Sequence, residues 1–271
     1  MRLEYGAQSD KGCVRQNNED SYRALPEMKL FVLSDGMGGL QWGETASRIA
    51  VETIVEHCRK GDQNPSLPMA GARSEGVSEM TNRLASAVRV ANSTIHGAAQ
   101  EDADRRPMGA TVVAVRFAGE RMSLAHVGDS RVYRQRGRTL EQLTRDHSFI
   151  GEQMRCGRMT ATEAASSQLQ NVLVRALGID PTVEVDLSEE LILESDTVLL
   201  CSDGLTRELS DQQISAVLSD HLGVQETADR VVELAKHVGG GDNITAIVVR
   251  PALRPVGGIR RIGRLSQWFK S

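Results

Sequence analysis

Several aspartates in this sequence stand beside a glycine, at the end of an apolar run or just before one. They are Asp35, Asp129, Asp203 and Asp242. A single Asp-Gly pair usually marks a turn, because Asp bonds to its own backbone and Gly adopts positive φ. Four carboxylates in the same relation to predicted strands indicate a shared site instead. Clustered carboxylates are costly to bury unless a cation neutralises them.

The residue types in these motifs predict which cation that would be. They offer oxygen ligands without histidine or cysteine companions, a set that suits a hard ion such as Mg²⁺ or Mn²⁺. A pair of such ions is a known arrangement for the in-line attack of water on phosphorus. The segment VRQNNEDS at 14–21 adds an acidic pair beside an arginine.

Composition limits the classes of function. The chain has 271 residues, of which 40% are hydrophobic and 25% charged, the balance of a globular protein with a sizeable core. Aromatic residues make up only 3% and the formal net charge is −4. We therefore expect neither platforms for base stacking nor a broad nucleic-acid surface.

Cysteine usage and hydropathy bear on the compartment. The four cysteines are scattered, with no C-x-x-C pair, which favours a reducing compartment over a disulfide frame or a zinc site. The N-terminal residues lack the apolar core of a signal peptide, and no run approaches the roughly 20 apolar residues that cross a bilayer. We expect a cytoplasmic protein.

Short runs rich in Val, Leu and Ile predict six strands, at 29–33, 111–117, 122–127, 131–135, 197–201 and 244–249. Apolar residues at helical spacing predict four helices, at 43–58, 77–99, 211–219 and 226–238. The stretches 60–76 and 101–107 are predicted loops. Strand pairs and helix pairs alternate in blocks, which favours an α+β fold over a parallel βαβ sheet.

Eight motifs follow one another along the chain: VRQNNEDS, LSDGMGG, MGATVVAV, HVGDSRVY, LTRDHS, VRALG, CSDGL and GDNIT. In this order and spacing they resemble the metal-dependent (type 2C, PPM) serine/threonine protein phosphatases, and the DGMGG form is similar to the bacterial branch. The resemblance covers residues 1–250. It implies a four-layer α-β-β-α sandwich, with two central antiparallel sheets flanked by helix pairs.

The resemblance also implies a set of metal ligands. Asp35 would bridge two tightly bound Mn²⁺ or Mg²⁺ ions, and the carbonyl of Gly36 would turn inward to complete the shell of one. Asp203 and Asp242 would be the further direct ligands. Asp129 would share a third, weaker ion with Asp203.

Residues of the first motif would complete the site. Glu19 and Asp20 match an acidic pair that acts through metal-bound waters. Arg15 matches the phosphate-binding arginine, whose planar fork grips two phosphate oxygens. The animal enzymes commonly have a histidine that is proposed as the acid for the leaving group, and this chain has Met37 there. Because methionine cannot donate a proton, protonation must come from elsewhere.

Other polar residues near the motifs are predicted to be structural. His126 and His147 lack the Ser or Cys partner that a catalytic triad would require. Ser34 and Ser202 are expected to brace the ligand loops, and Asn243 to orient a water or the ligand loop.

Two segments carry alternative interpretations. Residues 147–171 occupy the place of the family's mobile flap, and the alternative is a plain surface helix pair. The tail 251–271 lies beyond the resemblance and contains a basic amphipathic helical pattern, which suits an anionic membrane or a partner. The alternative for the tail is a frayed terminus.

The resemblance implies a monomeric phosphatase that hydrolyses phosphoserine and phosphothreonine in proteins, by direct attack of a metal-bridged hydroxide, and that opposes a serine/threonine kinase. Membrane contact is expected only through the tail. Two alternatives stay open. One is a non-catalytic phosphoprotein-binding module, against which the intact aspartates argue. The other is a two-metal hydrolase of small phosphoesters or nucleic acid, and the acidic charge balance disfavours only nucleic acid.

Overall fold

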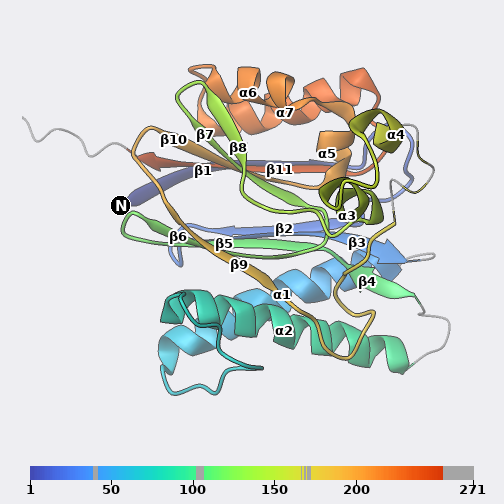
Figure 1. Ribbon diagram of the computed structural model, residues 1–271. Helices are drawn as coiled ribbons and strands as arrows, with labels where there is room; N and C mark the ends of the chain where they lie inside the picture. Colours follow the sequence, from blue (N-terminus) through green and yellow to red (C-terminus); the bar gives the residue numbers. More distant parts are fainter. Residues whose placement is uncertain (39–41, 102–106, 166, 168, 170–171, 253–271) are drawn as a thin grey trace, which may run out of the picture.

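The computed structural model describes residues 1–38, 42–101, 107–165, 167, 169 and 172–252. Two antiparallel sheets stack face to face, and a helix pair covers the outer face of each (Figure 1). The predicted α+β class and the four-layer α-β-β-α sandwich are confirmed.

Each sheet joins strands from distant parts of the chain. The first sheet has the order β1 (Arg2–Asp10), β11 (Ile244–Ala252), β10 (Asp196–Cys201), β7 (Arg131–Arg136) and β8 (Thr139–Gln142). The second has the order β2 (Asp20–Leu25), β3 (Leu30–Gly38), β5 (Val112–Ala118), β6 (Arg121–Val127) and β9 (Asp186–Leu191), and β4 (Met108–Ala110) pairs with β3. The site residues near β2, β3, β10 and β11 therefore come from both sheets.

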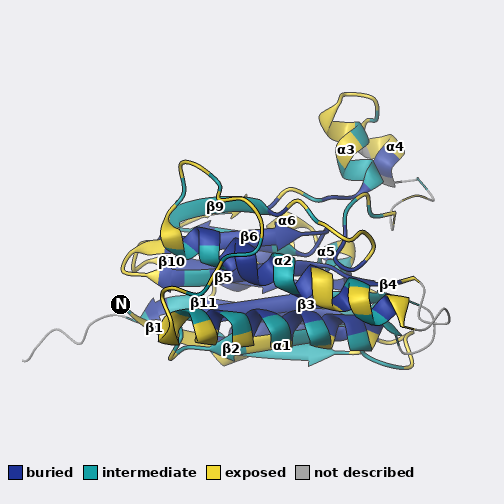
Figure 2. Cartoon of the chain, turned by 90° about the horizontal axis from the view of Figure 1, so that it is seen from below, coloured by how far each residue is buried: buried dark blue, intermediate teal, exposed yellow. Residues whose placement is uncertain are grey.

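The helices fall into three groups. The second sheet is covered by α1 (Trp42–Gln63) and α2 (Glu79–Gln100). The first is covered by α6 (Asp211–Ser219) and α7 (Val224–Val238), with the short α5 (Asp203–Glu208) beside them. The remaining two, α3 (Phe149–Arg155) and α4 (Ala161–Ala165), project from the body of the sandwich (Figure 2).

Alternation along the central strands builds the core. In β3, Leu30 and Val32 pack against the α1 and α2 layer, whereas Phe31 and Leu33 pack between the two sheets. Residues of β5, β10 and β11 divide between layers in the same way. Because both faces of a central strand are buried, its residues form a continuous apolar run, and such runs are what the sequence shows.

The predicted strands and helices are all present, with shifted ends except for the helix at 211–219. Two of the predicted bounds need correction. Helix α1 continues to Gln63, so the first residues of the predicted loop 60–76 are helical. Strand β3 continues through the Asp-Gly pair to Gly38 because Gly36–Gly38 pair with β4, so the chain does not turn at Asp35. Strands β1, β2, β4, β8 and β9 have no counterpart among the predictions.

Two predicted segments lie mainly outside the described residues. They are the loop 101–107, of which 102–106 are not described, and the tail 251–271 beyond its first two residues. None of the described helices is both long enough and apolar enough to span a bilayer. The division into 1–250 and 251–271 stays a prediction.

Candidate active site

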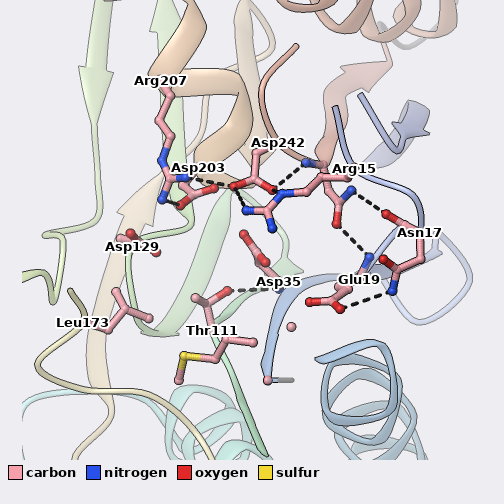
Figure 3. A pocket seen from close by; sticks show the side chains of 14 residues that line it. Arg15, Asn17, Glu19, Asp35, Thr111, Asp129, Leu173, Asp203, Arg207 and Asp242 are labelled. Atoms are coloured by element: carbon pink, nitrogen blue, oxygen red, sulfur yellow. Dashed lines mark hydrogen bonds and ion pairs between the residues drawn. The ribbon is translucent and has the colours of Figure 1, made fainter. Parts of the chain in front are cut away.

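A cavity of about 230 Å³ is lined by residues that both sheets supply (Figure 3). It brings together seven of the predicted site residues: Arg15, Glu19, Asp35, Gly36, Asp129, Asp203 and Asp242. Asp20 does not line the cavity, but it is the cross-strand partner of Asp35 in the pairing of β2 with β3. We call Asp20, Asp35, Asp129, Asp203 and Asp242 the acidic cluster.

Thr111, which lies between β4 and β5, fixes Asp35. The Asp35 amide donates to Thr111 Oγ1 at 3.0 Å, and the Thr111 amide donates to the Asp35 carbonyl at 2.8 Å. The Thr111 hydroxyl also lies 2.7 Å from that of Ser130, next to Asp129. The Ser34 hydroxyl donates to the Thr111 carbonyl at 2.6 Å, which confirms the bracing role predicted for Ser34.

Asp20 links the two sheets. The Ser202 hydroxyl donates to Asp20 Oδ2 at 2.8 Å, and the Thr245 hydroxyl donates to the same oxygen at 2.6 Å. Ser202 precedes Asp203 at the start of α5, and Thr245 lies on β11. These bonds confirm the bracing role predicted for Ser202.

Two arginines neutralise Asp242. Arg15 donates from Nε to Asp242 Oδ1 at 2.8 Å and from Nη2 to Oδ2 at 2.9 Å. Arg207 donates from Nη1 to the same Oδ2 at 2.8 Å, and it also forms an ion pair with Asp203 (Figure 3). The guanidinium of Arg15, which is predicted to bind phosphate, therefore binds the Asp242 carboxylate in this structure.

Burial dominates the electrostatics of the acidic cluster. Burial, with repulsion from neighbouring carboxylates, raises the pKa of Asp20 to about 7 and that of Asp129 to about 7. The same causes raise the pKa of Asp35 well above its usual range and that of Asp203 above its usual range. Two buried oxygens, Asp20 Oδ1 and Asp203 Oδ1, have no hydrogen-bond partner among the described residues.

These features fit a divalent ion. The donors are carboxylate oxygens, some of them unpartnered, and the ionised forms are disfavoured as long as no further cation is present. Mn²⁺ and Mg²⁺ bind such oxygens and would reverse that penalty. Which oxygen coordinates which ion stays a prediction.

Gly36 is required by close packing. A Cβ at this position would lie 1.9 Å from the carbonyl oxygen of Gly43 and 2.8 Å from that of Glu19. The Gly36 amide donates to that same Glu19 carbonyl at 3.1 Å. The start of α1 and the Glu19 segment therefore meet β3 where only glycine fits. The predicted contact of the Gly36 carbonyl with a metal ion stays a prediction.

Asn243 orients the loop that carries Glu19. Its Oδ1 accepts from the Glu19 amide at 2.8 Å, and its Nδ2 donates to the carbonyls of Lys11 at 3.0 Å and Asn17 at 2.9 Å. Asn17 in turn donates to Glu19 Oε1 at 3.2 Å. Asn243 therefore holds the loop of Lys11 to Glu19, and the role predicted for it toward a water or the ligand loop stays a prediction.

His147 holds the turn in front of Asp129. Its amide donates to the Gly128 carbonyl at 2.9 Å, and its ring Nδ1 accepts from the Gly128 amide at 3.1 Å. The ring proton therefore lies on Nε2, which is 3.3 Å from Asp186 Oδ2. Asp186 Oδ1 also accepts from Arg175 at 2.6 Å. The hydrogen bond from His147 and the Arg175 charge lower the pKa of Asp186.

We call His126, His147 and Asp186 the histidine cluster. Each offers an atom within 4.8 Å of the others, a spacing at which three residues could hold a metal ion. Here Arg175 already supplies the cation for Asp186, and Gly128 occupies Nδ1 of His147. The contacts support the structural role predicted for His147.

The segment 147–171 lies beside the site. Ser148 caps α3 by accepting from the Gly151 amide at 3.1 Å. Residues of α3, among them Ile150 and Met154, line a second cavity of about 180 Å³ together with Asp129 and Arg207. The position agrees with that predicted for the flap, and its mobility stays a prediction.

Arg207 and Thr111 are site residues that have no counterpart among the predictions. Arg207 follows Asp203 by four residues, a spacing at which side chains meet on a helix, so a helix beginning at Asp203 would have indicated the pair. Thr111 stands in the motif MGATVVAV, but that motif does not indicate its contacts, because they depend on the pairing of β3 with its neighbours.

Comparison with known proteins places this fold and site in a family. The profile described as Protein phosphatase 2C matches residues 11–238. The serine/threonine protein phosphatase PstP of Mycobacterium tuberculosis is 38% identical over 246 residues, which cover 91% of this chain and 44% of that protein. The serine/threonine phosphatase stp of Listeria welshimeri is 33% identical over 252 residues, which cover 92% of this chain and 96% of that one.

Solved structures agree. The crystal structure of the M. tuberculosis phosphatase PstP/Ppp has a TM-score of 0.81 at 37% identity and covers 93% of this chain and 99% of that one. A structure of the PstP catalytic domain in complex with two manganese ions has a TM-score of 0.78 at 37% identity, covering 92% and 97%. This chain belongs to the protein phosphatase 2C family.

Proposed function

We propose that this chain is a protein-serine/threonine phosphatase that depends on Mn²⁺ or Mg²⁺. The observation that supports this most is the acidic cluster: buried carboxylates from both sheets, with unpartnered oxygens, beside an arginine that can bind phosphate. Residues 1–250 would form the catalytic domain. The chain spans 44% of the mycobacterial relative's length, so the activity of a longer protein is part of the proposal.

The proposed roles follow the position of each group. Asp35, Asp203 and Asp242, with the Gly36 carbonyl, would hold two divalent ions, and Asp129 would help to hold a third. When bound, the ions supply an activated water and neutralise phosphate charge. Asp20, which joins β2 to β11 and to Ser202 behind Asp35, and Glu19, which faces the cavity from the loop held by Asn243, would act through waters on these ions.

Arg15 would bind the phosphate. Its side chain is 52% exposed and reaches the cavity, so it can release Asp242 when a metal ion takes that carboxylate. The freed fork would then orient two phosphate oxygens toward the ions. Proton delivery to the leaving group would come from water ordered in the cavity, because Met37 lies there and carries no proton.

The proposed partners are phosphorylated proteins and a serine/threonine kinase that makes them. The segment 147–171, next to the cavity, would contact the protein part of the substrate, and the tail 251–271 would be the place of any membrane contact. We further propose that the protein is a monomer. We place it in the cytoplasm, because all four cysteines are free thiols and a reducing compartment keeps them so.

The test uses the full chain, stripped of metal and then titrated with Mn²⁺ or Mg²⁺. We expect hydrolysis of phosphoserine and phosphothreonine peptides only when metal is present. Full activity in excess chelator would overturn metal dependence. Tight peptide binding without hydrolysis would favour the binding module, and a higher kcat/KM for small phosphoesters than for any phosphopeptide would favour the small-ester hydrolase.

A further inference from the structure

We propose that Arg207 is an internal counter-cation of the acidic cluster, which must be displaced before Asp242 can bind a divalent ion. The guanidinium of Arg207 contacts both Asp203 and Asp242 (Figure 3). It therefore competes with the metal and sets how much metal the site needs. This inference rests on the proposed function for the presence of the ions.

Both oxygens of Asp242 are engaged. Oδ1 accepts from Arg15 Nε at 2.8 Å and from the Asn243 amide at 2.9 Å. Oδ2 accepts from Arg15 at 2.9 Å and from Arg207 at 2.8 Å. A metal ion that uses either oxygen must therefore displace a donor or approach against two positive charges. Both effects weaken its binding.

The two arginines differ in how firmly they are placed. Arg15 comes from a loop and its side chain is 52% exposed, whereas that of Arg207 is 31% exposed and comes from α5. Helix α5 is pressed against the chain before β11, because a Cβ at Gly204 would lie 2.1 Å from the Asn243 carbonyl oxygen. Leu205 in the same helix is fully buried. The backbone of Arg207 is therefore held close to Asp203 and Asp242, and only its side chain is free to respond to a metal ion.

A place for the displaced guanidinium exists. Arg207 lines the active-site cavity and also the second cavity of about 180 Å³, where Asp129 offers an acceptor and Asp146, which already pairs with Arg131, adds negative charge. A rotation of the side chain toward α3 would move its charge away from Asp242 without moving α5. Metal binding would then be coupled to the position of Arg207.

The charges of the residues that line the cavity support a competition between Arg207 and a metal ion. The main cavity is lined by five carboxylates, Glu19, Asp35, Asp129, Asp203 and Asp242, against two guanidinium groups, those of Arg15 and Arg207. In the metal-free protein Arg207 reduces the repulsion among these carboxylates. Removing its charge should therefore destabilise the metal-free fold and strengthen metal binding.

The test compares Arg207→Gln, which keeps length and a hydrogen-bond donor, with Arg207→Lys, which keeps the charge but loses the fork. Arg59→Gln is the control, because it removes a surface arginine paired with Glu56 on α1. Calorimetric titration of the metal-free proteins with MnCl₂ gives the affinity. Thermal unfolding in chelator gives the stability of the metal-free fold.

We expect Arg207→Gln to lower the Kd for Mn²⁺ on the order of tenfold and to lower the metal-free Tm, with a smaller fall of the Kd in Arg207→Lys. The Arg59→Gln Kd should stay at the wild-type value. An unchanged or weaker affinity in Arg207→Gln would overturn the inference. If that variant does not fold without metal, an Arg207→Lys affinity equal to wild type would overturn it. Failure of the wild type itself to bind Mn²⁺ would refute the proposed function instead.

Discussion

The acidic cluster, which includes Asp129, and the histidine cluster, which contacts Gly128 through His147, meet at the Gly128–Asp129 turn, and their carboxylates are stabilised in opposite ways. In the histidine cluster, Asp186 accepts from His147 and Arg175, which lower its pKa. In the acidic cluster, burial raises the pKa of Asp35 and Asp203, and oxygens are left without partners.

The difference shows how a carboxylate that supports the fold can be told from one that awaits a ligand. Asp186 has its cation in the protein, so its ionised form is favoured and a metal ion would gain little. The cavity beside the acidic cluster is lined by more carboxylates than guanidinium groups. Within the cluster, Asp20 Oδ1 and Asp203 Oδ1 have no hydrogen-bond partner among the described residues. The histidine cluster has three groups at metal-ligand spacing although Arg175 already pairs with its carboxylate, so spacing alone does not identify a metal site.

The largest expected effect comes from removing one carboxylate in each cluster. Asp35→Asn should lower kcat/KM on the order of a thousandfold, because Asp35 is expected to bridge both ions. Asp186→Asn is the matched control: it should keep the wild-type metal content and kcat/KM within about tenfold, and lose about 1–3 kcal/mol of stability. Metal counting, kinetics and urea unfolding measure these quantities. Loss of metal in Asp186→Asn would remove the distinction between the clusters.

Much of this fold could be predicted because apolar periodicity reports burial. The run at 29–33 and the helix at 77–99 lie in the core, and their patterns show it. Strand β9 has the sequence DLSEEL and no fully buried residue, so it is ordered by pairing with β6 rather than by an apolar pattern. Strand β1 depends likewise on its nine-residue pairing with β11.

The aspartates of the site could be predicted because strand ends and glycines mark them. Their partners could not, because those contacts bridge long distances in the sequence. His147 meets Gly128 across 19 positions, and Thr245 meets Asp20 across 225. Arg207 has a local signal, but only if α5 is known to begin at Asp203.

A second substitution tests the turn that both clusters share. Asp129→Ala should keep two tightly bound ions and lose on the order of a hundredfold in kcat on phosphoserine peptides. The loss should be smaller on nitrophenyl phosphate, whose leaving group needs little protonation, because Asp129 would order the water that donates this proton. Metal counting and rates on both substrates are the measurements. Equal losses on the two substrates would refute this role, and loss of the tight pair would make Asp129 one of its ligands.

The third prediction concerns Arg15, which pairs with Asp242 and is proposed to bind the phosphate of the substrate. Arg15→Ala should raise KM about tenfold and change kcat less, because a guanidinium that binds ground and transition states alike contributes mainly to binding. Arg23→Ala, on the exposed side of β2, is the control and should leave both constants unchanged. Unchanged kcat/KM in Arg15→Ala would exclude Arg15 from phosphate binding.

The smallest expected effect is a difference in how stability depends on pH, measured without metal. The pKa of Asp129 is about 7 in the folded, metal-free protein and about 4 in an unfolded chain. The folded state therefore holds a proton between these values that the unfolded state lacks. The stability from this proton is fully present below about pH 4 and is lost as the pH rises toward 7.

Asn at position 129 has no proton of this kind to lose. The free energy of unfolding of Asp129→Asn, minus that of wild type, should therefore increase by about 1–3 kcal/mol as the pH rises from 4.5 to 7.5. Asp186 has the opposite sign: its lowered pKa contributes stability above about pH 4 that is lost as the pH falls further. Asp186→Asn should therefore be less stable than wild type above about pH 4, and the difference should shrink as the pH falls below that value. Urea unfolding of metal-stripped proteins at several pH values measures both differences. Parallel curves for wild type and Asp129→Asn would show that Asp129 is ionised in the metal-free protein, and the two clusters would then differ in metal affinity without differing in protonation.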